Sequence, residues 1–186
     1  MSKVKVARSA GFCFGVSRSV KMAEEMLESG PCLSYGPLIH NDDVVSSLAE
    51  RGLSVINSPA DVRPGDRVLI RSHGISLAEE EALRRAGAEI TDATCPNVAH
   101  IHRLAASASA AGRQVLVIGA AGHPEVRAIC GRCEGAKVVA NAQELEKLLN
   151  DEPNLRSESV TVVVQTTQTE ENLKECEILI KKWCTN

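Results

Sequence analysis

The chain has 186 residues, of which 44% are hydrophobic and 24% are charged, and its formal net charge at pH 7 is −3. These values are typical of an ordinary globular protein, and a slightly acidic chain without a long basic run argues against nucleic-acid binding. The sequence has no run of roughly 18 consecutive apolar residues and no apolar signal segment at its start. We therefore expect a cytoplasmic protein without membrane contact, whose seven cysteines are metal ligands, catalytic thiols or core residues rather than disulfides.

Short apolar runs alternate with amphipathic segments along the chain, which is the pattern of parallel α/β units. The predicted strands are Lys3–Ala7, Cys32–Tyr35, Leu53–Ile56, Arg67–Arg71, Ala88–Thr91, Gln114–Ile118, Ala136–Ala140 and Val160–Gln165. The predicted helices are Val16–Glu28, Asp43–Glu50, Leu77–Arg85, Val98–Ala111, Glu125–Cys130, Ala142–Leu149 and Glu170–Trp183. The strands at 114–118 and 160–165 are rich in β-branched residues without clear alternation, so we expect helices on both of their faces.

The order of these elements repeats weakly along the chain. Each half begins with a cysteine and a helix, and its first strand leads to His40 in one half and to His123 in the other. We predict two small parallel-sheet α/β lobes related by this pseudo-repeat, the first spanning residues 1–95 and the second residues 96–186. The repeat also predicts a further strand and a third cysteine after the second lobe, and residues up to 186 do not contain them.

Two cysteines occupy equivalent positions, each between the end of a predicted strand and the start of a helix. They are Cys13 and Cys95. Because ligands in open α/β sheets bind beyond the carboxyl ends of the strands, we predict that both thiols face one central object. Cys95-Pro96 matches the Cys-Pro ending of iron–sulfur ligand runs, although a dipeptide is a weak signal by itself. Phe12 and Phe14 flank Cys13, and we expect them to cover it against water.

Three histidines lie at the ends of predicted strands, each followed within a few residues by a helix start. They are His40, His73 and His123. A lone histidine is more often a core residue than a ligand, but three at one edge favour a diphosphate or a carboxylate, which imidazole N–H groups and helix amides would bind together. Glu125 follows closely, and the residues leave two readings open: a general acid at a dry site, or a first-turn glutamate that complements the helix dipole.

Other cysteines and histidines are predicted to have no role in chemistry. Cys130 and Cys133 form a single C-x-x-C motif, and without a second pair we interpret them as exposed loop cysteines rather than a zinc site. His100 and His102 are two apart on a helix and cannot share a face, so we predict both at the surface. The motifs of P-loop NTPases, dinucleotide-binding enzymes and α/β-hydrolases do not occur.

Six motifs in this order and spacing resemble the LytB/IspH family, the 4-hydroxy-3-methylbut-2-enyl diphosphate reductases of the non-mevalonate isoprenoid pathway. The motifs are Gly11-Phe12-Cys13-Phe14-Gly15-Val16, Ile39-His40-Asn41, Ser72-His73-Gly74, Asp92-Ala93-Thr94-Cys95-Pro96, Gly122-His123-Pro124-Glu125-Val126 and Gln165-Thr166-Thr167. The resemblance covers essentially the whole chain, and the chain corresponds to the first two-thirds of a family member.

The resemblance implies a trefoil of three α/β lobes around a [4Fe-4S] iron–sulfur cluster that is bound by one cysteine from each lobe. Cys13 and Cys95 would be two of these three ligands. His40, His73 and His123 would contact the substrate diphosphate. Glu125, His123 and Thr166 would form the catalytic group, with Glu125 relaying a proton to the leaving hydroxyl and Thr166 hydrogen-bonded beside it at the substrate. Removal of the allylic hydroxyl would give isopentenyl and dimethylallyl diphosphate, with electrons from a ferredoxin or flavodoxin donor.

The third lobe of the family, with its cysteine and its Ser-x-Asn segment, has no counterpart in this sequence. Cys176 and Cys184 lie on the last predicted helix rather than at a strand end, so we do not expect either to replace the missing ligand. We expect a site that is open on one side and incomplete for catalysis alone. Two alternatives remain: a zinc-dependent hydrolase that uses His123 and Glu125, and a non-catalytic remnant that binds a diphosphate or a partner.

Overall fold

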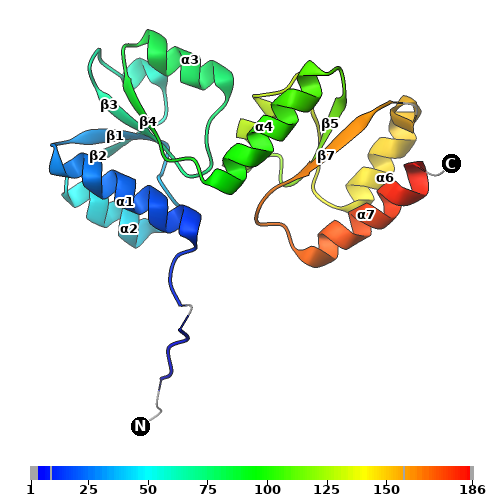
Figure 1. The fold of residues 1–186 in the computed structure, drawn as a ribbon, viewed down its shortest axis with the longest axis horizontal. Coiled ribbons are helices and arrows are strands. Elements are labelled where there is room, and N and C mark those ends of the chain that lie inside the picture. Colours follow the sequence, from blue (N-terminus) through cyan, green and yellow to red (C-terminus); the bar gives the residue numbers. More distant parts are fainter. Residues whose placement is uncertain (1–3, 9, 157, 185–186) are drawn as a thin grey trace.

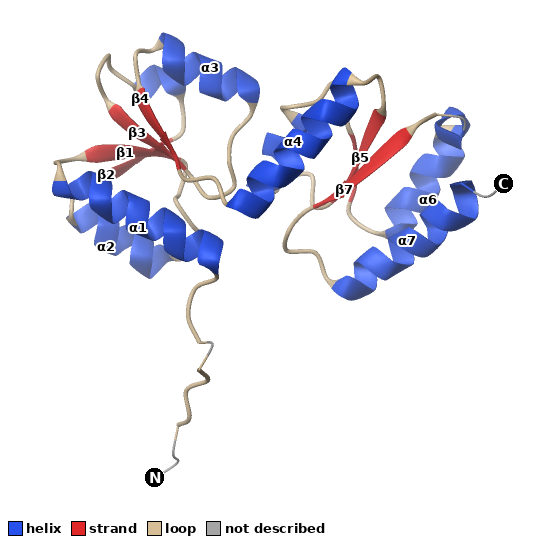
Figure 2. Cartoon of the chain, viewed as in Figure 1, coloured by secondary structure: helices blue, strands red, loops and turns tan. Residues whose placement is uncertain are grey.

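Two parallel β-sheets, each with helices on both faces, make up this chain in the computed structural model, which describes residues 4–8, 10–156 and 158–184 (Figures 1 and 2). The predicted α/β class with two parallel-sheet lobes is confirmed. The first sheet lies between residues 32 and 92 and the second between residues 114 and 164. A division of the chain between residues 95 and 96 remains our proposal.

The first lobe has a four-stranded parallel sheet in the order β2-β1-β3-β4. Its elements are α1 (Phe14–Glu28), β1 (Cys32–Tyr35), α2 (Asp42–Glu50), β2 (Leu53–Ile56), the 3-10 turn η1 (Pro59–Asp61), β3 (Arg67–Ile70), α3 (Leu77–Arg85) and β4 (Glu89–Asp92). Helices α1 and α2 cover one face and α3 covers the other (Figure 1). Successive residues of β3 point to opposite faces, so Leu69 packs with α1 and α2 whereas Val68 and Ile70 pack with α3.

The second lobe has a three-stranded parallel sheet in the order β6-β5-β7. Its elements are α4 (Pro96–Ala110), β5 (Gln114–Ile118), α5 (Pro124–Cys130), β6 (Lys137–Val139), α6 (Ala142–Asp151), the 3-10 turn η2 (Pro153–Arg156), β7 (Val160–Val164) and α7 (Glu170–Cys184). Helices α4 and α5 cover one face, and α6 and α7 cover the other. The central strand β5 is buried on both faces as predicted, whereas β7 lies at an edge and buries only Val163 fully.

The pseudo-repeat is visible in the topology of the two sheets. The order β2-β1-β3 of the first lobe corresponds to β6-β5-β7 of the second, and α1 and α4 are both helices of 15 residues that begin directly after a cysteine. The repeat therefore pairs Cys13 with Cys95, His40 with His123 and His73 with Thr166. The lobes differ where α6 takes the place of the short turn η1.

The predicted strand Lys3–Ala7 is wrong over the residues that the structure describes, and Lys3 itself lies outside them. Residues 4–7 are extended but pair with no strand, and Val4 and Val6 are 88% and 80% exposed. Figure 1 shows this segment leading away from the first lobe. A strand needs a neighbour for its backbone hydrogen bonds, and β-branched residues alone do not provide one.

The predicted helices are all present, and the starts of several follow from local capping. Asn41 caps α2 by accepting a hydrogen bond from the Val44 amide, and Ser76 forms a capping box with Glu79 at the start of α3. Such caps satisfy amides that have no partner within the helix. Among the described residues, none of the helices combines the length and the apolar character needed to span a bilayer.

Candidate functional site

The two cysteines singled out by the sequence occupy the same structural position in the two lobes. Cys13 is the N-cap residue of α1 and Cys95 is the N-cap residue of α4. Both have extended backbones, with ψ values of 163° and 133°, and neither side chain makes a capping hydrogen bond. Each thiol therefore lies at the positive end of a helix dipole and is available to another ligand.

The sulfur of Cys95 lies against the first turn of α1, which begins directly after Cys13. A Cβ atom placed on Gly15 would be 2.4 Å from Cys95 Sγ, so the two elements approach as closely as a glycine allows. The buried Ser19 hydroxyl lies 3.0 Å from the Gly15 carbonyl oxygen and 2.9 Å from that of Ala93, which ties the inner face of α1 to the loop before Cys95. The structure thus places the Cys95 sulfur beside Gly15, two residues after Cys13.

The expected aromatic cover over Cys13 is not present. Cys13 is exposed, and Phe12 and Phe14 are themselves 49% and 73% exposed. The segment before α1 leads away from the lobe and does not cover these side chains (Figure 1). The flanking phenylalanines therefore form an apolar rim that faces outward.

The three predicted histidines come together from both lobes. The ring centroids of His40 and His73 are 4.6 Å apart, and that of His123 lies 5.6 Å from His40 and 5.3 Å from His73. One ring nitrogen from each residue lies within 4.8 Å of the other two. Loops after β1 and β3 provide His40 and His73, and the N-cap of α5 provides His123. We call this group the histidine cluster.

Burial keeps part of the histidine cluster neutral. Burial lowers the pKa of His73 to about 4, with further lowering by His40, His123 and Arg71, and burial also lowers the pKa of His123. The Nδ1 atom of His73 is buried and has no hydrogen-bond partner among the described residues. The cluster thus contains a buried ring nitrogen that a ligand could pair with, and the positive charge of Arg71 acts on the same histidine.

The tautomer of His123 follows from its capping role. Its Nδ1 atom accepts a hydrogen bond of 3.2 Å from the backbone N–H of Glu125, so in the neutral ring the proton is on Nε2. The free side of the ring is then a hydrogen-bond donor. A donor suits the oxygen of an anion, whereas a metal ion needs an unprotonated nitrogen.

Glu125 is buried, with 1% exposure, and both of its carboxyl oxygens bind Thr166. The Thr166 backbone N–H donates to Oε1 at 2.7 Å, and its hydroxyl donates to Oε2 at 2.8 Å. A first-turn glutamate that only complemented the helix dipole would face solvent, whereas Glu125 is turned inward toward Thr166. A hydroxyl both donates and accepts, so Thr166 can donate to Oε2 and still accept a hydrogen bond from a ligand.

Sequence reasoning missed two polar residues that hold these loops in place. The side chain of Gln165 accepts a hydrogen bond from the Ala120 N–H at 3.0 Å and donates to the Thr167 hydroxyl at 2.7 Å, so it joins the loop after β7 to the loop before α5. Ser19 performs the corresponding task between α1 and the loop before Cys95. A polar residue at an apolar helix position was the available signal for Ser19.

The lobes meet where the end of α5 contacts the loop before α3. A Cβ atom on Gly131 would lie 2.2 Å from Cβ of Ser76. Arg132 donates from Nε to the Ile75 carbonyl oxygen at 3.2 Å and forms a partly buried ion pair of 3.3 Å with Glu80. We call this contact the lobe junction. The junction joins the loop that follows His73 to the end of the helix that His123 caps.

Two minor predictions are wrong. Cys130 and Cys133 are partly buried rather than exposed, and burial raises the pKa of Cys133 to about 11, so neither is a reactive surface thiol. His102 is 5% exposed rather than at the surface, because α4 lies between its own sheet and the loops of the first lobe (Figure 2). A helix in such a place buries more than one face, which spacing alone does not reveal.

Comparison with known proteins places the chain among relatives of one kind. The family model described as LytB protein matches residues 4–186. A 4-hydroxy-3-methylbut-2-enyl diphosphate reductase of Aquifex aeolicus is 40% identical over 98% of this chain and 63% of its own length, and one of Nitratidesulfovibrio vulgaris is 41% identical over 89% and 59%. The chain therefore spans about three-fifths of these curated relatives.

Two solved structures share the fold. One is described as (E)-4-hydroxy-3-methyl-but-2-enyl diphosphate reductase, the terminal enzyme of the non-mevalonate pathway; it has a TM-score of 0.79 and 38% identity over 98% of this chain and 65% of its own. The other, a reductase from Plasmodium falciparum, has a TM-score of 0.84 and 27% identity over 96% and 55%.

Proposed function

Because this chain belongs to the LytB protein family, we propose that it forms the first two lobes of an iron–sulfur reductase that removes the allylic hydroxyl of 4-hydroxy-3-methylbut-2-enyl diphosphate. The products would be isopentenyl and dimethylallyl diphosphate. The observation that carries the proposal is the contact of the Cys95 sulfur with the first turn of α1, directly after Cys13. The two N-cap thiols, at the starts of α1 and α4, would then face the same region.

Cys13 and Cys95, the two ligands that this chain would supply, suit a [4Fe-4S] cluster chemically. Soft thiolate sulfurs are the usual ligands of iron–sulfur clusters, and the thiols of Cys13 and Cys95 make no capping hydrogen bond. When bound, the cluster would supply electrons and a Lewis-acidic iron for cleavage of the C–O bond. In this proposal Gly15 keeps room for the Cys95 sulfur.

The histidine cluster would bind the diphosphate. Its rings come from both lobes, and His123 presents a donor on Nε2 because its other nitrogen caps α5. A zinc-dependent hydrolase is less well supported, because a metal on Nε2 of His123 would require a proton on Nδ1 and loss of the hydrogen bond from the Glu125 N–H.

Glu125 would hold the proton that the leaving hydroxyl takes up. Its burial excludes water from the carboxyl group, and the Thr166 hydroxyl at 2.8 Å offers a path between Oε2 and the substrate side. Thr166 is exposed, so its hydroxyl is accessible to a bound ligand. In this scheme Glu125 and Thr166 act as one hydrogen-bonded unit.

Electrons would come from a ferredoxin or flavodoxin, as the family resemblance implies. We propose a cytoplasmic location, because thiols that bind iron must remain reduced.

Anaerobic reconstitution of this chain with iron, sulfide and an external dithiol tests the two cluster ligands. We expect bound iron and sulfide with visible absorbance, and at least a fivefold lower iron content in Cys13→Ser and in Cys95→Ser, since each removes a thiolate ligand. Cys130→Ser, which changes a partly buried thiol of raised pKa, is the matched control and should load iron normally.

Each alternative gives a different result in the same experiment. A colourless protein with one zinc per chain would contradict the reductase and support the hydrolase. Diphosphate binding without iron, indifferent to both cysteine substitutions, would support a non-catalytic binding protein.

Binding of inorganic pyrophosphate is expected to be linked to proton uptake. The lowering of the His73 pKa to about 4 amounts to roughly 3 kcal/mol at most. A single negative charge about 4 Å away contributes about 4 kcal/mol at an effective dielectric constant near 20, so a bound diphosphate would raise this pKa above its value in the free chain. Affinity should therefore fall as the pH rises through the pKa of the bound state.

Calorimetry at pH 6.5 in buffers of different ionisation enthalpy measures this uptake. We expect the chain to take up on the order of one proton more than His73→Asn does. Equal uptake by the two proteins would contradict a role for His73 at the anion.

A further inference from the structure

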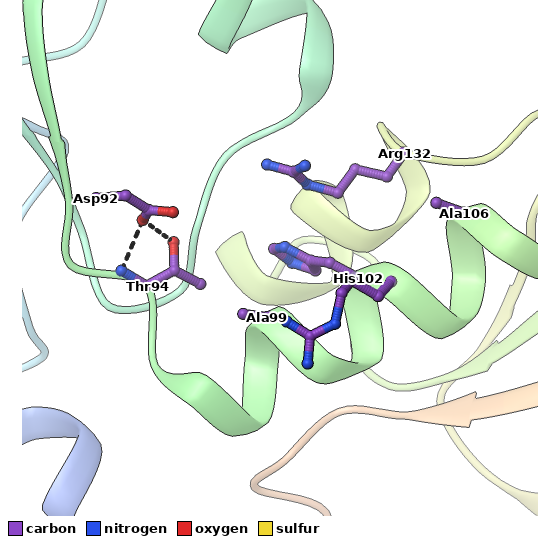
Figure 3. A pocket seen from close by; sticks show the side chains of 7 residues that line it. Asp92, Thr94, Ala99, His102, Ala106 and Arg132 are labelled. Carbon is purple, nitrogen blue, oxygen red and sulfur yellow. Dashed lines mark hydrogen bonds between the residues drawn. The ribbon is translucent and has the colours of Figure 1, made fainter.

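A second polar cavity, which we call the α4 pocket, lies between α4 and Arg132 and has a volume of about 200 Å³ (Figure 3). None of the cysteines or histidines proposed above lines it. The loop that carries His73 lies against His102, because a Cβ atom placed on Gly74 would be 2.5 Å from the His102 ring. A water molecule takes about 30 Å³ in the liquid, so the pocket has room for a group of a few non-hydrogen atoms.

His102 gives the α4 pocket a buried polar group without a partner. The residue is 5% exposed, and its Nε2 atom is buried with no hydrogen-bond partner among the described residues. Burial, with a smaller contribution from Arg132, lowers the His102 pKa to about 4, so the ring is neutral near pH 7. Leaving such a nitrogen unpaired costs roughly 1–3 kcal/mol, which a ligand that accepts from Nε2–H would recover.

Two arginines give the pocket a positive charge. Arg103 lies on the same face of α4 as the small side chains of Ala99 and Ala106, which leave space in front of it. Arg132 reaches the pocket from the second lobe, and its hydrogen bond to Ile75 and its ion pair with Glu80 fix the position of its guanidinium. A fixed guanidinium binds an anion with little further loss of side-chain entropy.

Asp92 on the opposite wall restricts which anion fits (Figure 3). Its Oδ1 atom accepts hydrogen bonds from the backbone N–H and the hydroxyl of Thr94, which leaves Oδ2 as the oxygen able to accept from a ligand. A fully deprotonated anion would be repelled by this carboxylate. An anion that retains an acidic proton would donate it to Oδ2 instead.

We propose that the α4 pocket binds a phosphate group, free or as a small monoester, that retains one acidic proton. Arg103, Arg132 and the Nε2–H of His102 face its oxygens, and Asp92 accepts the hydrogen bond from its P–OH group. The second ionisation of a phosphate monoester has a pKa near 6, so about a quarter of the ester still carries an acidic proton at pH 6.5. Sulfate has the same shape but carries no proton there, so the site discriminates between the two.

Imidazole ¹⁵N NMR of the chain, with phosphate or sulfate added at pH 6.5 and constant ionic strength, tests this site. The His102 signal is assigned by its loss in His102→Gln. We expect it to shift saturably with phosphate, at least tenfold more tightly than with sulfate, and to do so equally in His123→Asn. A shift that does not saturate, or one that sulfate produces equally well, overturns the proposal.

Two substitutions test the charges of Asp92 and Arg103 one at a time. Asp92→Asn keeps the Oδ1 acceptor for Thr94 but removes the negative charge, and we expect it to bring sulfate affinity to within about threefold of phosphate affinity. Arg103→Gln should weaken phosphate binding at least tenfold, whereas Arg85→Gln, which removes an exposed arginine at the end of α3, should not. If Asp92→Asn keeps the preference for phosphate over sulfate, or if both arginine variants bind phosphate alike, the pocket does not select a protonated phosphate.

Discussion

Replacement of Gly15 by alanine is expected to lower the free energy of unfolding by about 1–3 kcal/mol and to reduce iron loading at least fivefold. The backbone of Gly15 is helical and its φ lies outside the left-handed region, so alanine should otherwise stabilise the helix by up to about 1 kcal/mol. The loss arises because the added methyl group would lie 2.4 Å from Cys95 Sγ. Either the sulfur or the first turn of α1 must move.

A double-mutant cycle isolates this contact. In a Cys95→Ala background the sulfur is absent, so Gly15→Ala should be neutral or slightly stabilising in urea denaturation. Gly122→Ala is the matched control, because a methyl group there meets no atom within 4 Å, and it should leave both stability and iron content unchanged. The same loss with and without the Cys95 sulfur would show that Gly15 does not hold this thiol in place.

Much of the fold follows from local sequence. The amphipathic segments and the apolar runs predicted each helix and seven of the eight strands, because hydrophobic periodicity acts over a few residues. The segment 4–7 has the same local signal and is unpaired, because a strand depends on a neighbour that may lie anywhere in the chain. Local propensity does not predict whether such a neighbouring strand is present.

The sequence predicted the part of the site that depends on where the strands end. Placing His40, His73 and His123 at strand ends predicted their meeting, since parallel strands of one lobe end at the same edge. Their approach across the two lobes depends on the lobe junction, which no motif marks. Gly131 there carries no signal beyond being a glycine, and the motif that contains Gly15 does not indicate its contact with Cys95. The roles of Gly15 and Gly131 follow from the structure, in which a Cβ atom at either position would lie too close to a neighbouring residue.

Replacement of Gly131 by alanine is the corresponding test of the lobe junction. Its φ of −71° suits alanine, but the methyl group would lie 2.2 Å from Cβ and 3.0 Å from Cα of Ser76. The Cα and Cβ atoms of Ser76 cannot move away by a side-chain rotation. The end of α5 must therefore separate from the loop before α3. The hydrogen bond of 3.3 Å from the Leu77 N–H to the Gly131 carbonyl oxygen would be lost with it.

The consequence should reach the histidine cluster, because His73 precedes the displaced loop and His123 begins the helix that ends at Gly131. We expect Gly131→Ala to weaken pyrophosphate binding at least tenfold, a loss of about 1.4 kcal/mol or more, with each lobe still folded by circular dichroism. Glu134→Ala, an exposed change in the same turn, should bind as the unmodified chain does. Arg132→Gln should weaken binding in the same direction without adding volume, because it removes the ion pair with Glu80. Full affinity in both junction variants would mean that the lobes hold the three imidazoles together through other contacts.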